Sequence, residues 1–171
     1  MQTRNRHIPI TYAGKSGKTP LSSFDAALYG AGVGNLNLVH LSSVIPTGRQ
    51  PVTDIECDHN HANHGDRLYC VYAAQTVVDF GKTAAAGLGW VMTQDDANQA
   101  WGLFVEHVGE SEEDVVEQIH GSLQYMTSYR TDSTWGAIQH CTTSVSCEGD
   151  PVTALVIAHY QLTAWENSVN H

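Results

Sequence analysis

The sequence predicts one α+β domain in which helices cover the faces of β-sheets. Short stretches rich in apolar, β-branched or aromatic residues recur along the chain, for example at 68–78 and 152–162, and each is typical of a buried strand. Two further stretches, 19–30 and 111–129, carry apolar residues at helical spacing. The 171 residues, 42% of them hydrophobic, suffice for one packed core, and no linker or internal repeat divides them.

Glycine, proline and polar residues bound the expected strands. The run 36–45 is largely apolar, but Ser42 and Ser43 interrupt it and Pro46 prevents further ladder pairing. Residues 82–90 are rich in alanine and glycine, so they fit either a strand or a tightly packed helix. The other expected strands are 8–13, 68–78, 101–108, 135–147 and 152–162.

The first expected helix begins where Thr19 can cap its N-terminus and Pro20 can occupy its first turn without losing a needed hydrogen bond. Apolar residues at helical spacing are expected to form its buried face. These residues are Leu21, Phe24, Ala27 and Leu28.

The second expected helix begins at Ser111 with a capping arrangement and ends near Met126 or Tyr129. Its acidic first turn complements the helix dipole and needs no catalytic explanation. The residues expected to face the core are Val115, Ile119, Ser122, Leu123 and Met126.

The charge and the cysteines narrow the class of protein. With 18 acidic and 8 basic side chains, the formal net charge is −10, which argues against binding to nucleic acid because phosphates require a basic face. No apolar stretch approaches the length of a membrane span, and no signal-peptide pattern precedes residue 7. The four cysteines, at 57, 70, 141 and 147, form no paired motif, which favours reduced thiols. The sequence therefore predicts a soluble, cytoplasmic protein that contacts neither nucleic acid nor membrane.

Residues 17–46 form the most informative stretch, GKTPLSSFDAALYGAGVGNLNLVHLSSVIP. In an arbitrary strand, a serine pair such as Ser42-Ser43 would bond to the local backbone. Here the whole stretch resembles the N-terminal signature of the pyruvoyl-dependent arginine decarboxylases, in which the precursor cuts itself between the two serines. The resemblance implies that the single domain 1–171 is cleaved into chains 1–42 and 43–171. It also implies that Ser43 becomes a covalent pyruvoyl group, the built-in cofactor of the family.

The same resemblance implies roles for further residues. Gly102-Leu103-Phe104-Val105-Glu106 matches a family motif, so Glu106 becomes the candidate active-site acid beside Ser43. Without the resemblance, Glu106 would be expected to point outward and Asp25 to lie on the surface. Asn37 is expected to stabilise the oxyanion during cleavage. The residues expected to bind substrate are Asp25, Gly34, Leu36, Ser42 and Val44, with Asp25 suited to a guanidinium.

At the level of the whole protein, the resemblance implies an αββα sandwich, with residues 82–90 in a central sheet. It further implies a homotrimer or a dimer of trimers of cleaved protomers, with active sites between neighbours. The expected reaction converts L-arginine to agmatine and carbon dioxide through a Schiff base, a step that can serve polyamine biosynthesis.

Two alternatives remain open at this stage. A changed side-chain pocket would make the enzyme a decarboxylase of another amino acid. A cluster of possible ligands would instead suit a metal-binding or assembly protein on the same scaffold. Because its spacing lacks the paired geometry of a zinc module, an exposed histidine-rich loop is favoured and no metal ligand is assigned. The cluster comprises Cys57, Asp58, His59, His61 and His64.

Overall fold

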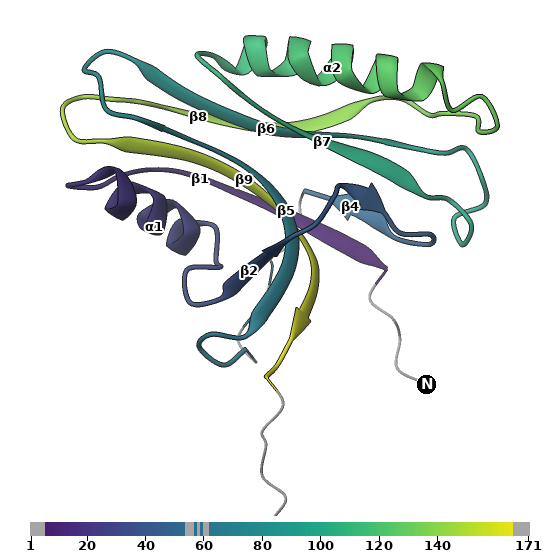
Figure 1. Cartoon of the computed structure of the whole chain (residues 1–171), viewed down its shortest axis with the longest axis horizontal. Coiled ribbons are helices and arrows are strands. Elements are labelled where there is room, and N and C mark those ends of the chain that lie inside the picture. Colours follow the sequence, from purple (N-terminus) through teal and green to yellow (C-terminus); the bar gives the residue numbers. More distant parts are fainter. Residues whose placement is uncertain (1–5, 54–56, 58, 60–61, 166–171) are drawn as a thin grey trace, which may run out of the picture.

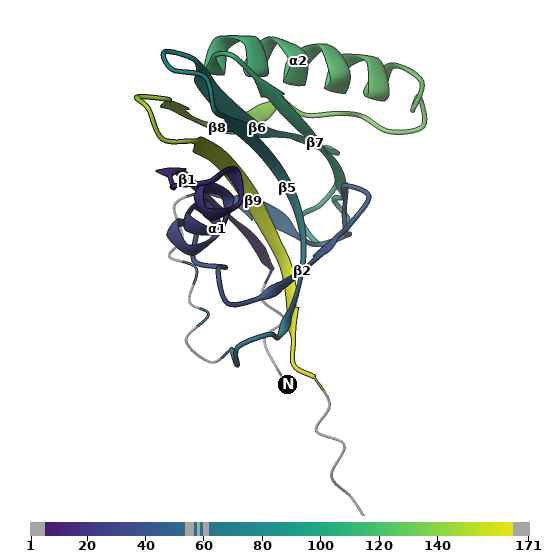
Figure 2. The same cartoon turned by 60° about the vertical axis from the view of Figure 1, so that its left-hand side comes forward.

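The computed structural model describes residues 6–53, 57, 59 and 62–165, which form a four-layered αββα sandwich. Figure 1 shows one helix outside each of two stacked sheets, and the turned view in Figure 2 shows the same layers. This arrangement confirms the expected fold class. The elements are β1 (His7–Ser16), α1 (Pro20–Gly30), β2 (Asn37–His40), β3 (Val44–Ile45), β4 (Gln50–Val52), β5 (Arg67–Val77), β6 (Thr83–Met92), β7 (Gly102–Gly109), α2 (Glu112–Ser128), β8 (Gln139–Ser146) and β9 (Val152–Thr163).

The two sheets differ in strand order and in the helix that covers them. The five-stranded sheet has the order β2-β5-β9-β1-β4 and packs against α1, whereas the four-stranded sheet has the order β3-β7-β6-β8 and packs against α2. The stretch 82–90 is therefore a strand, as expected. The expected strand 36–45 is wrong as a single element, because it divides into β2 in one sheet and β3 in the other.

The stretch 135–147 begins its strand later than expected. Regular pairing of β8 with β6 begins at Gln139, whereas Trp135 makes only an isolated bridge to Thr93. The amide of Gly136 donates to the carbonyl of Met92 at 2.8 Å. The chain therefore passes across the end of β6 before it joins the ladder.

Strand β9 lies in the middle of the five-stranded sheet and is buried on both faces. Val156 and its even-numbered neighbours face the core between the sheets, and Leu155 and Ile157 face α1. The two-residue period of a strand separates these faces, and burial of both explains why the sequence here is continuously apolar.

Helix α1 contacts the sheet through small residues. Thr19 caps it, as expected, by accepting a hydrogen bond from the amide of Ser22. Ser23 and Ala27 are fully buried, and the hydroxyl of Ser23 lies 2.8 Å from that of Thr153 on β9. Leu21 is 75% exposed, so its expected burial is wrong. It lies two residues from Ser23, about 200° around the helix, and therefore faces solvent.

Helix α2 lies on β6 in the way its pattern predicts. Val115, Ile119 and Leu123 are fully buried, and the hydroxyl of Ser111 accepts a hydrogen bond from the amide of Asp114. Beneath the helix, a Cβ atom added at Gly89 would collide with the side chain of Ile119. Glycine at this position therefore lets the helix lie close to the sheet. No helix in the described part of the chain is long and apolar enough to cross a membrane.

Two glycine-to-alanine substitutions test this packing, because they place the same methyl group in opposite surroundings. Gly89→Ala is expected to lower the free energy of unfolding by about 1–3 kcal/mol through overpacking against Ile119. Gly121→Ala is expected to raise it by up to about 1 kcal/mol, because Gly121 is exposed within α2 and has nothing within 4 Å of an added Cβ. Denaturant unfolding at matched protein concentration measures both. Equal effects of the two substitutions would contradict the close approach of α2 to β6.

Candidate active site

The chain passes from one sheet to the other at residues 41–43, and Ser43 has an unusual backbone there. Its φ angle is 68°, which makes it the one non-glycine residue with positive φ in the described part of the chain. An L-residue in this left-handed region costs about 1–2 kcal/mol relative to ordinary conformations. The strain lies next to the bond between Ser42 and Ser43, and such strain often accompanies a functional site.

Hydrogen bonds on both sides hold this crossing in place. Before it, the amide of Leu41 donates to the carbonyl of Cys70 on β5 at 2.9 Å. After it, the amide of Phe104 on β7 donates to the carbonyl of Ser43 at 2.8 Å. Val44 then pairs with Leu103 as β3 joins β7. The two sheets thus anchor opposite ends of the crossing, which keeps Ser43 in its strained conformation.

Glu106 is the side chain that meets the Ser43 hydroxyl. It lies two residues beyond Phe104 on β7 and therefore on the same face of the sheet. The Ser43 hydroxyl donates a hydrogen bond to Oε1 of Glu106, and the carboxyl side chain is 25% exposed. The structure therefore brings together two of the residues expected in the active site, although they are 63 positions apart.

His40 is a third member of this group; it lies within the stretch 17–46, but the resemblance assigned it no role. Its Nε2 lies 3.8 Å from the same Oε1 of Glu106, and its ring stacks on Tyr72 with 4.7 Å between centroids. The stacking on β5 fixes the ring beside the carboxylate.

Tyr160 is a further residue that the sequence pattern did not single out. Its hydroxyl donates to the carbonyl of Val44 at 3.1 Å, so β9 also supports the segment that follows Ser43. Burial, together with the nearby charge of Glu106, raises the pKa of Tyr160. The hydroxyl therefore keeps its proton and its role as a donor at neutral pH.

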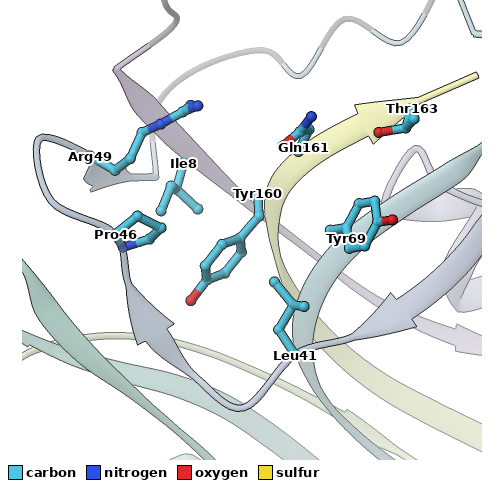
Figure 3. Close-up of a pocket in the computed structure, with 8 residues that line it drawn as sticks. All are labelled: Ile8, Leu41, Pro46, Arg49, Tyr69, Tyr160, Gln161 and Thr163. Carbon is cyan, nitrogen blue, oxygen red and sulfur yellow. The ribbon is translucent and has the colours of Figure 1, made fainter.

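A cavity of about 550 Å³ adjoins the crossing, within the usual range of small-molecule pockets. Figure 3 shows the ring of Tyr160 between Pro46 and Leu41, with Tyr69 to the right of both Tyr160 and Leu41. Neither Ser43 nor Glu106 is among the lining residues, so the cavity lies beside the crossing at residues 41–43 rather than around it. The lining residues are Ile8, Leu41, Pro46, Arg49, Tyr69, Tyr160, Gln161 and Thr163.

Asn37 lies apart from the serine pair within one chain. It begins β2, and its side-chain amide donates to the carbonyl of Gly65 at 2.6 Å. Three residue steps along an extended strand span about 10 Å, so Asn37 and His40 occupy opposite ends of β2. The structure of one chain therefore does not bring Asn37 to the Ser42 carbonyl.

The expected substrate-binding residues divide in the same way. Ser42 and Val44 are exposed and flank Ser43. Gly34 and Leu36 instead line a second cavity of about 410 Å³, which also has Tyr29, His59 and His64 in its wall. Asp25 is exposed on α1, one helical turn before Tyr29. One protomer thus presents two groups of candidate residues at different places on its surface.

The histidine-rich loop is only partly described. Asp58 and His61 lie outside the described residues, and His64 is exposed as expected. Cys57 and His59 are partly buried rather than exposed, because they contact His159 on β9. Among the described residues, Cys57, His59 and His159 form the group whose arrangement could hold a metal ion.

Comparison with known proteins points to one family, both by a family model and by individual relatives. Residues 7–163 match the family model described as pyruvoyl-dependent arginine decarboxylase. A relative of that name from Thermoplasma volcanium is 30% identical over 122 residues, which cover 71% of this chain and 64% of the relative. Another from Pyrococcus abyssi is 34% identical over 107 residues, which cover 63% of this chain and 64% of the relative. One from Methanocaldococcus jannaschii is 57% identical over 39 residues, which cover 23% of this chain and 24% of the relative.

The chain spans slightly less than two thirds of the length of the first two relatives. Among solved structures, a pyruvoyl-dependent histidine decarboxylase at pH 8 gives a TM-score of 0.41 at 14% identity, covering 55% of this chain and 50% of the other. The family model, in contrast, extends from the first strand to the end of the last one. The αββα chain with its Ser43–Glu106 contact therefore belongs to the pyruvoyl-dependent arginine decarboxylase family.

Proposed function

We propose that this chain is a self-processing decarboxylase that converts L-arginine to agmatine and carbon dioxide. The observation that carries the proposal is Ser43, which has a left-handed backbone next to the Ser42–Ser43 bond and donates a hydrogen bond to Glu106. A hydroxyl, an adjacent strained peptide and a carboxylate fit the formation of a pyruvoyl group at this position.

Self-cleavage begins with attack of Ser43 Oγ on the carbonyl carbon of Ser42. The new C–O bond replaces the C–N bond, so an ester takes the place of the amide. Loss of the Ser43 Cα proton then expels the ester oxygen, which leaves Ser42 as a carboxylate and residue 43 as dehydroalanine. Water converts this to a pyruvoyl group and ammonia. The products are chains 1–42 and 43–171.

Glu106 has two tasks in this scheme. Before cleavage, its carboxylate accepts the hydrogen bond from Ser43 and orients the nucleophile. After cleavage it lies beside the group derived from residue 43, where it can deliver a proton to the substrate carbon that has lost its carboxylate. A pyruvoyl group at residue 43 would supply a ketone able to form a Schiff base with the substrate amine and to act as an electron sink.

The division of the candidate residues into two groups supports active sites between protomers. Asn37 is too far along β2 to contact the Ser42 carbonyl of its own chain, so the Asn37 that stabilises the oxyanion comes from a neighbour. Asp25, on α1 one helical turn before Tyr29, would contribute a carboxylate to the guanidinium of arginine. This assignment requires an oligomer, for which the family resemblance implies a homotrimer or a dimer of trimers.

Cleavage is expected to depend on the second serine and not on the first. Ser43→Ala removes the nucleophilic oxygen, so the protein should stay as one intact chain. Ser42→Ala is the matched control, because it alters the residue that donates only its carbonyl, and it should still separate into two chains. Denaturing mass spectrometry after incubation under native conditions distinguishes them. An intact wild-type chain would refute self-processing.

Glu106→Gln is expected to separate cleavage from turnover. Glutamine keeps an oxygen that accepts the Ser43 hydrogen bond, so two chains should form, but it has no acidic proton to deliver. Turnover of arginine should fall by about 10²–10⁴-fold. Release of carbon dioxide and amine measures this, with lysine, ornithine, histidine and glutamate as competing substrates. If the wild-type protein preferred one of these amino acids, the pyruvoyl chemistry would stand but arginine would be rejected as the substrate. If Glu106→Gln turned over arginine as fast as wild type, the role of Glu106 would be rejected.

Active sites shared between neighbours predict complementation of two inactive variants. Asn37→Ala and Ser43→Ala should each fail to cleave efficiently alone. Coexpressed with tags of different mass, they should form mixed oligomers in which the Ser43 of an Asn37→Ala chain meets an intact Asn37. Only the Asn37→Ala chain should then be cut. The absence of cleavage in purified mixed oligomers would show that Asn37 does not act across the interface.

A further inference from the structure

Three potential metal ligands converge where the loop after β4 meets the five-stranded sheet. Cys57 and His59 lie in this loop, and His159 lies on β9, 100 positions beyond His59. The His59 Nε2 and His159 Nδ1 atoms are 2.8 Å apart. The Cys57 Sγ atom lies 3.3 Å from the first and 3.2 Å from the second. Each residue thus directs its metal-binding atom toward a common centre.

The surroundings of His159 determine which of its nitrogens carries the proton. The hydroxyl of Thr11 on β1 donates to the carbonyl of Ala31 at 2.8 Å, so its oxygen is left to accept a hydrogen bond. It lies 2.7 Å from Nε2 of His159, which must therefore be the protonated nitrogen. The lone pair of Nδ1 then points at Cys57 and His59. Metal-bound histidines are oriented in the same way by a partner on the other nitrogen.

His159 is a buried side chain of the five-stranded sheet, with only 4% of its surface exposed. A polar ring among apolar residues of the sheet needs partners, and Thr11 supplies only one of them.

We infer that Cys57, His59 and His159 form a binding site for a divalent cation of the Zn²⁺ class. Sulfur and imidazole nitrogen are the ligands that Zn²⁺ prefers, and three of them leave one tetrahedral position for water or another donor. Tetrahedral coordination at usual bond lengths separates two nitrogens by about 3.3 Å and nitrogen from sulfur by about 3.6 Å. The observed separations are a few tenths of an ångström shorter, so small side-chain shifts would admit the ion. Binding deprotonates Cys57 and releases that proton to solvent.

The position of the site gives the ion a structural role. It would tie the loop to β9 beside the residues that follow α1, since Thr11 links His159 to Ala31. His59 also lines the second cavity together with Gly34 and Leu36. The bound ion therefore holds one wall of that cavity in place. This role is compatible with the proposed decarboxylase and does not depend on it.

Metal content and coordination can be measured independently of activity. Tag-free protein is incubated with excess Zn²⁺, desalted and analysed for metal, and its affinity is determined by competition with a chromophoric chelator. Parallel loading with Co²⁺ reports on the ligands, because tetrahedral thiolate coordination produces a charge-transfer band and intense visible bands. Wild type is expected to retain one Zn²⁺ per chain and to show both features. Uncleaved Ser43→Ala should behave identically.

Variants identify the ligands. Cys57→Ser and His59→Gln lie in the loop, where they do not disturb the sheet, and each should weaken Zn²⁺ binding by at least about tenfold. Cys57→Ser should also abolish the thiolate band. His159→Gln tests the buried ligand, and Thr11→Val, a positioning variant, should weaken binding by about 10–100-fold. Cys141→Ser and His140→Gln on β8 are the matched controls and should bind as wild type does.

Two results would overturn the assignment. The first is wild-type protein that retains less than stoichiometric Zn²⁺ after loading and desalting. The second is an unchanged affinity in both Cys57→Ser and His59→Gln, which would place any bound metal elsewhere. Because circular dichroism of the loop variants verifies folding, a loss of binding in them reports on coordination alone.

Discussion

The short pairing of β3 with β7 is the constraint on which the candidate active site depends. Only two residues of β3 join the ladder, yet they place Ser43 opposite Phe104 and within reach of Glu106. On the other side, β2 continues in a different sheet. The chain has to cross from one sheet to the other within three residues, and the positive φ of Ser43 makes this change of direction possible. The packing of two sheets thus creates the backbone strain next to the bond between Ser42 and Ser43.

The helices could be predicted because their buried residues recur at helical spacing, and a strand such as β9 because it is a continuous apolar run. The sequence could not reveal that 36–45 changes sheets, because alternation of apolar residues records burial and not the identity of the partner strand. The misplaced Leu21 has a similar origin. The other residues of the expected face, Phe24, Ala27 and Leu28, do pack against the sheet. Leu21 does not, because the buried Ser23 rather than Leu21 meets β9.

The site was predictable only where contiguous residues carried the resemblance. Ser42, Ser43 and Glu106 were expected, and the last two do meet. His40, Tyr160 and His159 were not expected, because each acts through partners that are distant in sequence. The separation of Asn37 from Ser43 within one chain was also hidden, since a family pattern does not state how far apart its residues lie in the fold. Local patterns can thus name candidates, but only tertiary structure groups them.

The strand order has a consequence for the fate of the molecule after the proposed cleavage. The segment 1–42 contains β1, α1 and β2, and β1 lies between β9 and β4 with seven residues paired to β9. The small chain would therefore remain paired with strands of the large chain on both sides of β1, and it could dissociate only if the core unfolded. Once denatured, however, the two chains would have to find each other again in solution. The uncleaved precursor folds as one continuous chain, and that chain would be lost on cleavage. The cleaved protein would therefore depend on slow unfolding, rather than on refolding, to remain native.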